Sequence, residues 1–172
     1  MCIRDSLYED NRETKIDSLK KLRPPFQTRS GRTVYGGGGI TPDVYIPWKS
    51  EISESTRKVM SHPKRFLFNW STTFVKNNDS ISKDYRDFQS NWSFSSDTFS
   101  KFLSYVGDED AEIDIQELKK DKEYLENILK SEVAGVKWGR DELWGVRVKV
   151  DSQVLGALKH FNEANAFLVK TN

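Results

Sequence analysis

The sequence predicts an α+β fold that is mainly α-helical, in which a short β-hairpin precedes a helical domain. Five of the ten glycines fall between residues 31 and 39, among short runs of β-prone residues. After Pro47, apolar residues instead recur at spacings of three and four, the period of a helix that buries one face. This change in pattern places the boundary between the two parts near Trp48 to Ser53.

The hairpin is predicted from residues 26–29 and 32–35, two β-prone runs joined at Ser30 and Gly31. This pair suits a turn because glycine adopts positive φ without a Cβ clash. Further along, residues 41–43 read Thr-Pro-Asp and predict a second turn. Strand composition then returns briefly at residues 44–46.

Four consecutive glycines, Gly36 to Gly39, follow the predicted hairpin. They have no side chains to pack, so they predict a bulge or a place where another backbone or a peptide approaches closely. A phosphate-binding loop is excluded, since no Gly-Lys-Ser/Thr follows and no helix opens directly after Gly39.

The first predicted helices follow the boundary. Ser53 is placed to cap a helix that continues to about Met60, and His62-Pro63 ends it. Residues 64–77 then carry bulky apolar residues on one face of an amphipathic helix.

The later predicted helices occupy residues 84–91, 98–106, 115–120, 121–144 and 153–168. Gly107 is expected to end the second of these, and a break near Trp138 and Gly139 is expected in the longest. Asp151 is predicted to cap the last helix, whose inward-facing residues are Val154, Leu158, Phe161 and Phe167.

The charges and the metal-ligating residue types exclude several functions. With 27 basic and 26 acidic residues, the chain offers no field of one sign to attract nucleic acid or anionic lipid. The sequence contains no run of 18 apolar residues, so no transmembrane helix is predicted.

The residue types that bind metals are also sparse. Cys2 is the only cysteine, and neither His62 nor His160 has a second ligand residue at the spacing of a metal site. The acidic residues 108–112 lack the ligand spacing of a calcium loop and predict a solvated turn, so no metal and no cofactor is expected.

One motif resembles a known family. Residues 31–43, Gly-Arg-Thr-Val-Tyr-Gly-Gly-Gly-Gly-Ile-Thr-Pro-Asp, are similar to the closing segment of the peptidase domain in carboxyl-terminal processing peptidases, also called tail-specific proteases. The form is similar to that of envelope members from Bacteroidetes-type bacteria. A second segment resembles the last helices of the same proteins: Leu143-Trp144-Gly145, followed by Val150-Asp151, Val154 and Ala157-Leu158.

The resemblance implies a serine endopeptidase with a Ser nucleophile and an activating Lys, acting on unstructured C-terminal tails of envelope proteins in the bacterial periplasm or cell envelope. In that family both catalytic residues precede the glycine-rich segment, so none is expected here. The segment would supply sheet framework near the site. The framework residues are Gly36, Gly37, Gly38, Gly39, Ile40, Pro42 and Asp43. Polypeptide substrates are the expected partners, and a homo-oligomer is a further expectation.

The expected organisation has three parts: a linker or insertion at residues 1–22, the end of a peptidase sheet at 23–47, and a helical C-terminal domain at 48–172. Residues 1–6 match nothing in the family and are interpreted as non-native, and no secretory signal is expected in this chain. The alternative function is a non-catalytic helical module for protein interaction or regulation. The helical part is rich in aromatic residues, which occur in binding grooves as well as in cores. A standalone enzyme of another kind has no motif to support it.

Overall fold

The computed structural model describes residues 22–29, 31–36, 44–46 and 52–169. It is mainly helical, with one short antiparallel hairpin near the N-terminus, which confirms the predicted α+β class. The chain divides into two compact units: residues 1–49 with 156–172, and residues 50–155. The predicted three-part organisation stays a prediction.

The first unit contains the hairpin formed by β1 (Pro25–Gln27) and β2 (Thr33–Tyr35). The strands pair in antiparallel register, so that Phe26 lies opposite Val34. The C-terminal helices are α9 (Ser152–Leu158), whose end falls in this unit, and α10 (Phe161–Val169). All three residues of β1 are exposed to solvent, whereas in β2 only Thr33 is exposed and Val34 and Tyr35 are half-buried.

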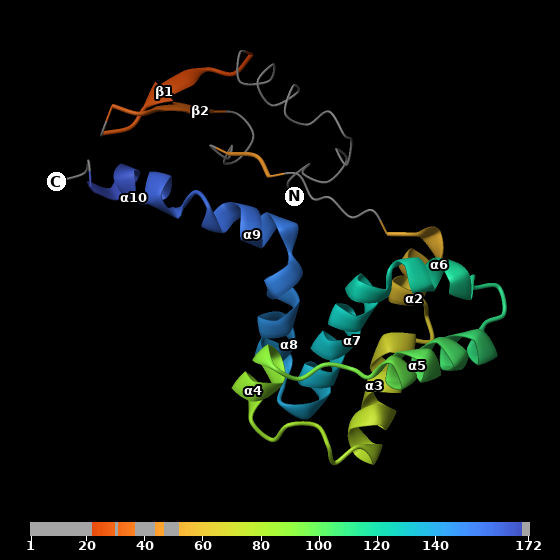
Figure 1. Ribbon diagram of the computed structural model, residues 1–172. Coiled ribbons are helices and arrows are strands. Elements are labelled where there is room, and N and C mark those ends of the chain that lie inside the picture. Colours follow the sequence, from red (N-terminus) through yellow and green to blue (C-terminus); the bar gives the residue numbers. More distant parts are fainter. Residues whose placement is uncertain (1–21, 30, 37–43, 47–51, 170–172) are drawn as a thin grey trace. The chain divides into compact units, whose positions relative to one another are not determined.

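The second unit is a helical bundle in which α7 lies between α3 and α8, as Figure 1 shows. Its elements are α2 (Glu54–Ser61), α3 (Phe66–Asn77), α4 (Tyr85–Ser90), α5 (Ser96–Glu109), α6 (Ile115–Lys120), α7 (Lys122–Lys137), α8 (Arg140–Arg147) and the 3-10 turn η1 (Val148–Val150).

Two buried apolar clusters form the core of this bundle. The larger contains Val59, Phe66, Leu67, Phe99, Phe102, Leu103, Val106, Ile113, Leu118, Leu125, Ile128 and Leu129, and the smaller contains Ile81, Phe88, Val133, Ala134 and Val146. Phe94 packs against both clusters. Its ring lies 4.7 Å from Trp92 and 5.6 Å from Phe74 in edge-on contacts, a geometry that aromatic pairs favour.

Side-chain caps fix the start of several helices where the sequence predicts them. Ser53 accepts the N–H of Thr56 at 3.2 Å, which confirms the predicted start of α2. Asp114 likewise caps α6, and Asp151 accepts the N–H of Val154 at the start of α9. The predicted break between α7 and α8 is also present, at Gly139 with φ +133°.

Two predictions about helix ends are wrong. Gly107 lies inside α5, which continues to Glu109; the backbone around Gly107 stays helical, and the N–H of Asp110 donates to Val106. The predicted last helix is divided into α9 and α10 at Lys159 and His160.

The predicted inward face of the last helix is wrong for three of its residues. Val154, Leu158 and Phe161 are 37%, 55% and 59% exposed. Their spacing is that of a buried helical face, but each side chain keeps more than a third of its surface open to solvent. Phe167 lies where side chains are not described.

Gly145 in α8 and Gly107 in α5 should respond in opposite ways to alanine. A Cβ on Gly145 would overlap the hydroxyl of Tyr85, which donates to the carbonyl of Glu142. A Cβ on Gly107 would meet only Ile115, at an ordinary 3.5 Å. We expect Gly145→Ala to lower the free energy of unfolding by about 1–2 kcal/mol, because overpacking outweighs the gain in helix propensity. Gly107→Ala should raise it by about 0.5–1 kcal/mol.

Urea unfolding followed by circular dichroism at 222 nm measures both changes in the same chain. Equal effects of the two substitutions would contradict the close packing of α8 on α4.

Candidate functional site

The residues predicted as framework for a peptidase site lie mostly outside the described part of the chain. Of them, Gly36 alone falls within it, at the end of β2. The others are Gly37, Gly38, Gly39, Ile40, Pro42 and Asp43. Their role near a catalytic site therefore stays a prediction.

Gly36 shows what the first glycine of the run does. Its N–H donates to the carbonyl of Pro24 at 3.0 Å, which extends the hairpin ladder by one pair. The ring of Phe26 lies against it, and an added Cβ would be 2.6 Å from the ring Cε2. Close approach at a glycine was predicted, but at Gly36 the approaching group is an aromatic ring of the same hairpin.

The turn of the hairpin confirms the role predicted for Gly31, which has φ +76°. The N–H of Gly31 donates to the carbonyl of Thr28 at 2.9 Å, and the N–H of Arg32 donates to the Thr28 hydroxyl at 3.0 Å. The Thr28 N–H donates to the carbonyl of Arg32 at 2.9 Å and closes the ladder. The hairpin is thus held by its own turn.

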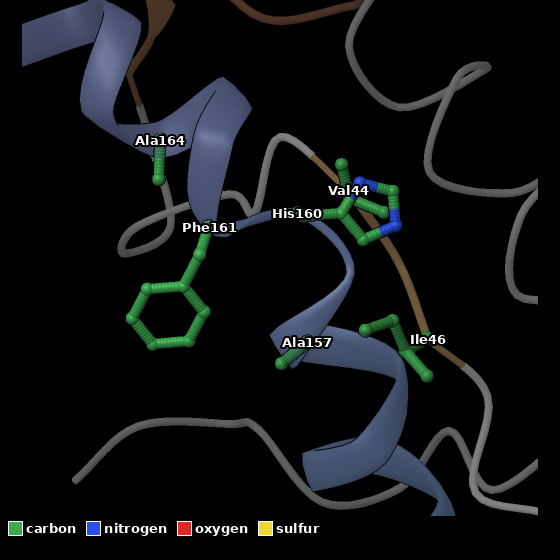
Figure 2. Close-up of a pocket in the computed structure, with 6 residues that line it drawn as sticks. All are labelled: Val44, Ile46, Ala157, His160, Phe161 and Ala164. Carbon is green, nitrogen blue, oxygen red and sulfur yellow. The ribbon is translucent and has the colours of Figure 1, made fainter.

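An apolar cavity of about 240 Å³ lies in the same unit, between the extended segment at residues 44–46 and the last two helices (Figure 2). Its lining residues are Val44, Ile46, Ala157, His160, Phe161 and Ala164. His160 alone among them is polar, and its Nδ1 lies 3.0 Å from a carboxylate oxygen of Glu163. Without a nucleophile in its lining, the cavity suits an apolar side chain better than acyl-transfer chemistry.

Lys130 on α7 is half-buried, and its amine is held by backbone carbonyls. Its Nζ donates to the carbonyls of Gln89, at 3.1 Å, and of Trp92, and it lies 5.3 Å from the ring centre of Phe88. Burial, and to a lesser extent the nearby Lys149, lowers the pKa of Lys130. Two carbonyl acceptors hold the ammonium form in place, so this lysine anchors the end of α4 rather than acting as a base.

Asp121 joins the start of α2 to the junction of α6 and α7. Its Oδ2 accepts the N–H of Ser53 at 2.8 Å and the hydroxyl of Thr56 at 2.7 Å. Burial acts to raise the pKa of Asp121, but the hydrogen bonds from Thr56 and Ser53 outweigh it and hold that pKa below its ordinary value. This carboxylate is structural, since both of its hydrogen-bond donors lie at the start of α2.

The acidic residues near the end of α5 are mostly exposed, and two of them also contact a basic side chain. Glu109 pairs with Lys64 at 2.9 Å, and Asp110 lies 3.3 Å from the Nε2 of His62. His62 also stacks on Phe66, with ring centres 4.2 Å apart. These contacts attach the end of α5 to the corner between α2 and α3.

No catalytic constellation appears among the described residues. Neither of the two fully buried serines is paired with a base: Ser131 donates to the carbonyl of Ile128 at 2.6 Å, and Ser71 has no hydrogen-bond partner in the described chain. Within that part of the sequence there is no group of three metal-ligating side chains. None of the described helices has both the length and the apolar composition needed to cross a bilayer.

Comparison with known proteins finds a similarity over one region of the chain. Residues 62–139 match a family model whose description is "Family of unknown function (DUF8443)". The match runs from the corner before α3 to the break after α7, and so includes most of the two core clusters. No curated protein and no solved structure matched the chain.

Sequence reasoning missed the roles of Lys130 and Asp121. Asp121 was recognised only as the start of a helix, because its partners Ser53 and Thr56 are more than 60 residues away. Nothing in the sequence around Lys130 separates it from the other lysines of α7. Both roles depend on contacts between helices.

Asp121→Asn should destabilise the chain in a pH-dependent way. Because the folded-state pKa of Asp121 is lowered, its carboxylate stabilises the fold above the unfolded pKa near 4, and this contribution is lost as the pH falls through the folded pKa. We expect a loss of about 1 kcal/mol at pH 7, discounted for partial exposure, and a smaller difference from the wild type at pH 3.

Urea unfolding at both pH values measures the difference. Asp79→Asn, in an exposed loop without a contact in the described residues, is the control and should change stability little at either pH. A loss for Asp121→Asn that is equal at pH 7 and pH 3 would contradict the ionised role of Asp121.

Proposed function

We propose that this chain is the C-terminal part of a serine endopeptidase of the Ser/Lys type that cleaves unstructured C-terminal tails of envelope proteins. In this proposal the helical bundle is a non-catalytic part, and the nucleophile and base belong to a peptidase region outside this sequence. The observation that carries the proposal is the motif at residues 31–43, with its resemblance to carboxyl-terminal processing peptidases.

The geometry of the described residues is compatible with a helical bundle that does not take part in catalysis. The motif begins in a hairpin whose turn is fixed by Gly31, and Gly36 continues the ladder toward the rest of the glycine run. The helices that follow use their polar groups for caps and for contacts between elements, as Asp121 and Lys130 do. We expect this use of polar groups in a protease region that supports or regulates the peptidase region without catalysing the reaction.

A second candidate is a helical module that binds another protein without any link to proteolysis. The exposed residues Trp144, Val148 and Val150 favour it, since they are 46%, 37% and 47% exposed. The guanidinium of Arg147 lies 5.4 Å from the Trp144 ring centre. Tryptophan and arginine are enriched among the residues that dominate binding energy at interfaces.

Peptidase assays distinguish the two candidates. We expect the purified chain to leave casein intact, because it lacks a paired nucleophile and base among its described residues. The same chain extended upstream to a Ser and a Lys of the family pattern should cleave it. Cleavage by the 172-residue chain alone would contradict the missing-dyad argument, and inactivity of the folded extended protein would favour the binding module.

Gly37→Val in the extended protein should abolish most of the casein cleavage. A β-branched side chain restricts the backbone and needs space that a glycine run in a sheet framework does not provide. Ser80→Val, in an exposed loop between α3 and α4, is the matched control and should retain activity. Normal activity of the Gly37→Val protein would contradict the framework role of residues 36–43.

A further inference from the structure

We propose that the outer edge of β2 pairs with β2 of a second copy of this chain, in an antiparallel and two-fold symmetric arrangement. The starting point is the direction of the backbone groups in the hairpin. Its hydrogen bonds join Pro24 to Gly36 at one end and Thr28 to Arg32 at the other. Hydrogen-bonded pairs alternate along an antiparallel ladder, so Phe26 and Val34 are the bonded pair between them.

Thr33 and Tyr35 therefore direct their N–H and C=O groups away from β1. Within the described residues these outward backbone groups have no hydrogen-bond partner. A row of such groups is a template for another strand. A hairpin with strands of three residues is also marginal in isolation, and additional strands stabilise it.

The two edges of the hairpin are not equivalent. On β1 the outward positions are Pro25 and Gln27, and Pro25 has no N–H to donate. Proline on an edge strand is a common protection against pairing. Only β2 thus presents two outward N–H groups, so pairing closes at two copies and does not continue into a fibre.

The edge of β2 is complementary to itself in one register. In this register Thr33 of each copy exchanges backbone hydrogen bonds with Tyr35 of the other copy. The two-fold axis then passes between the two Val34 side chains. That position is a non-hydrogen-bonded pair, where side chains lie closest and β-branched residues pack well. Arg32 then lies opposite Gly36, so no like charges oppose each other.

The same face of the resulting four-stranded sheet would carry an apolar row. Phe26 lies directly opposite Val34 within each hairpin and is 56% exposed. The row would read Phe26, Val34, Val34, Phe26 across the two copies. The contact is short, so the dimer would be a weak one, populated at high protein concentration. This inference goes beyond the proposed function and does not rest on peptidase activity.

Sedimentation velocity of the full chain from 10 to 500 µM (about two decades, chosen to cover weak interfaces) tests the proposal. We expect a monomer–dimer equilibrium with no larger species. Thr33→Pro removes an outward N–H without removing a bond of the hairpin ladder, and should weaken dimerisation at least tenfold. Gln27→Pro makes the same change on the β1 edge and should leave dimerisation within about twofold of the wild type.

Two further measurements separate this register from other contacts. Val34→Lys places like charges across the two-fold axis and should also weaken the dimer at least tenfold, with helical circular dichroism unchanged. In a sample that mixes isotope-labelled and unlabelled chains, a filtered nuclear Overhauser effect is expected between the Val34 Hα protons of the two copies. A chain that stays monomeric at 500 µM (the upper limit for a weak dimer here), or a dimer equally sensitive to Thr33→Pro and Gln27→Pro, would overturn the proposal.

Discussion

The burial of α7 on two sides is the constraint on which the helical bundle depends. Leu125, Ile128 and Leu129 belong to the larger core cluster, and Val133 and Ala134 belong to the smaller one. A single helix therefore contributes to both clusters, along successive turns. Because α3 and α8 pack on it from different directions, the positions of the remaining helices follow from which part of α7 they cover.

Close packing around this helix makes small residues necessary at particular points. At Gly135 an added Cβ would lie 2.8 Å from a methyl carbon of Leu143 in α8, so an alanine there would require the Leu143 side chain to shift. Polar groups at the edges of the bundle also hold neighbouring helices in fixed positions. Lys130 ties the end of α4 to α7, and Asp121 ties α2 to the start of α7. Such contacts specify one arrangement of helices, which a pattern of apolar residues alone does not.

Local signals in the sequence were sufficient for most helix starts, because a cap and its acceptor lie within a few residues of each other. Ser53, Asp114 and Asp151 are examples. Helix ends were harder: Gly107 is a good terminator in isolation, yet the packed apolar face of α5 continues to Val106 and the helix runs past it. The apolar spacing of Val154, Leu158 and Phe161 predicted burial, but periodicity reports only that a face exists and not what covers it.

The candidate site was least accessible to sequence reasoning. The motif at residues 31–43 gave a family resemblance and a correct turn at Gly31, whereas Lys130 and Asp121 acquire their surroundings from helices far away in the sequence. The direction of the outward groups on β2 depends on the strand register, which the exact pairing of Phe26 with Val34 determines. A shift by one residue would have directed those groups into the hairpin.

The break at Gly139 also has a kinetic consequence. It lets α8 fold back on α7 after a connection of two residues, so their contacts join positions close together in the sequence. The contacts between α3 and α7 join positions that are much further apart and require a longer loop to close. Since closing a long loop costs more entropy, we expect the α7–α8 pair to form early in folding and α3 to pack against α7 afterwards.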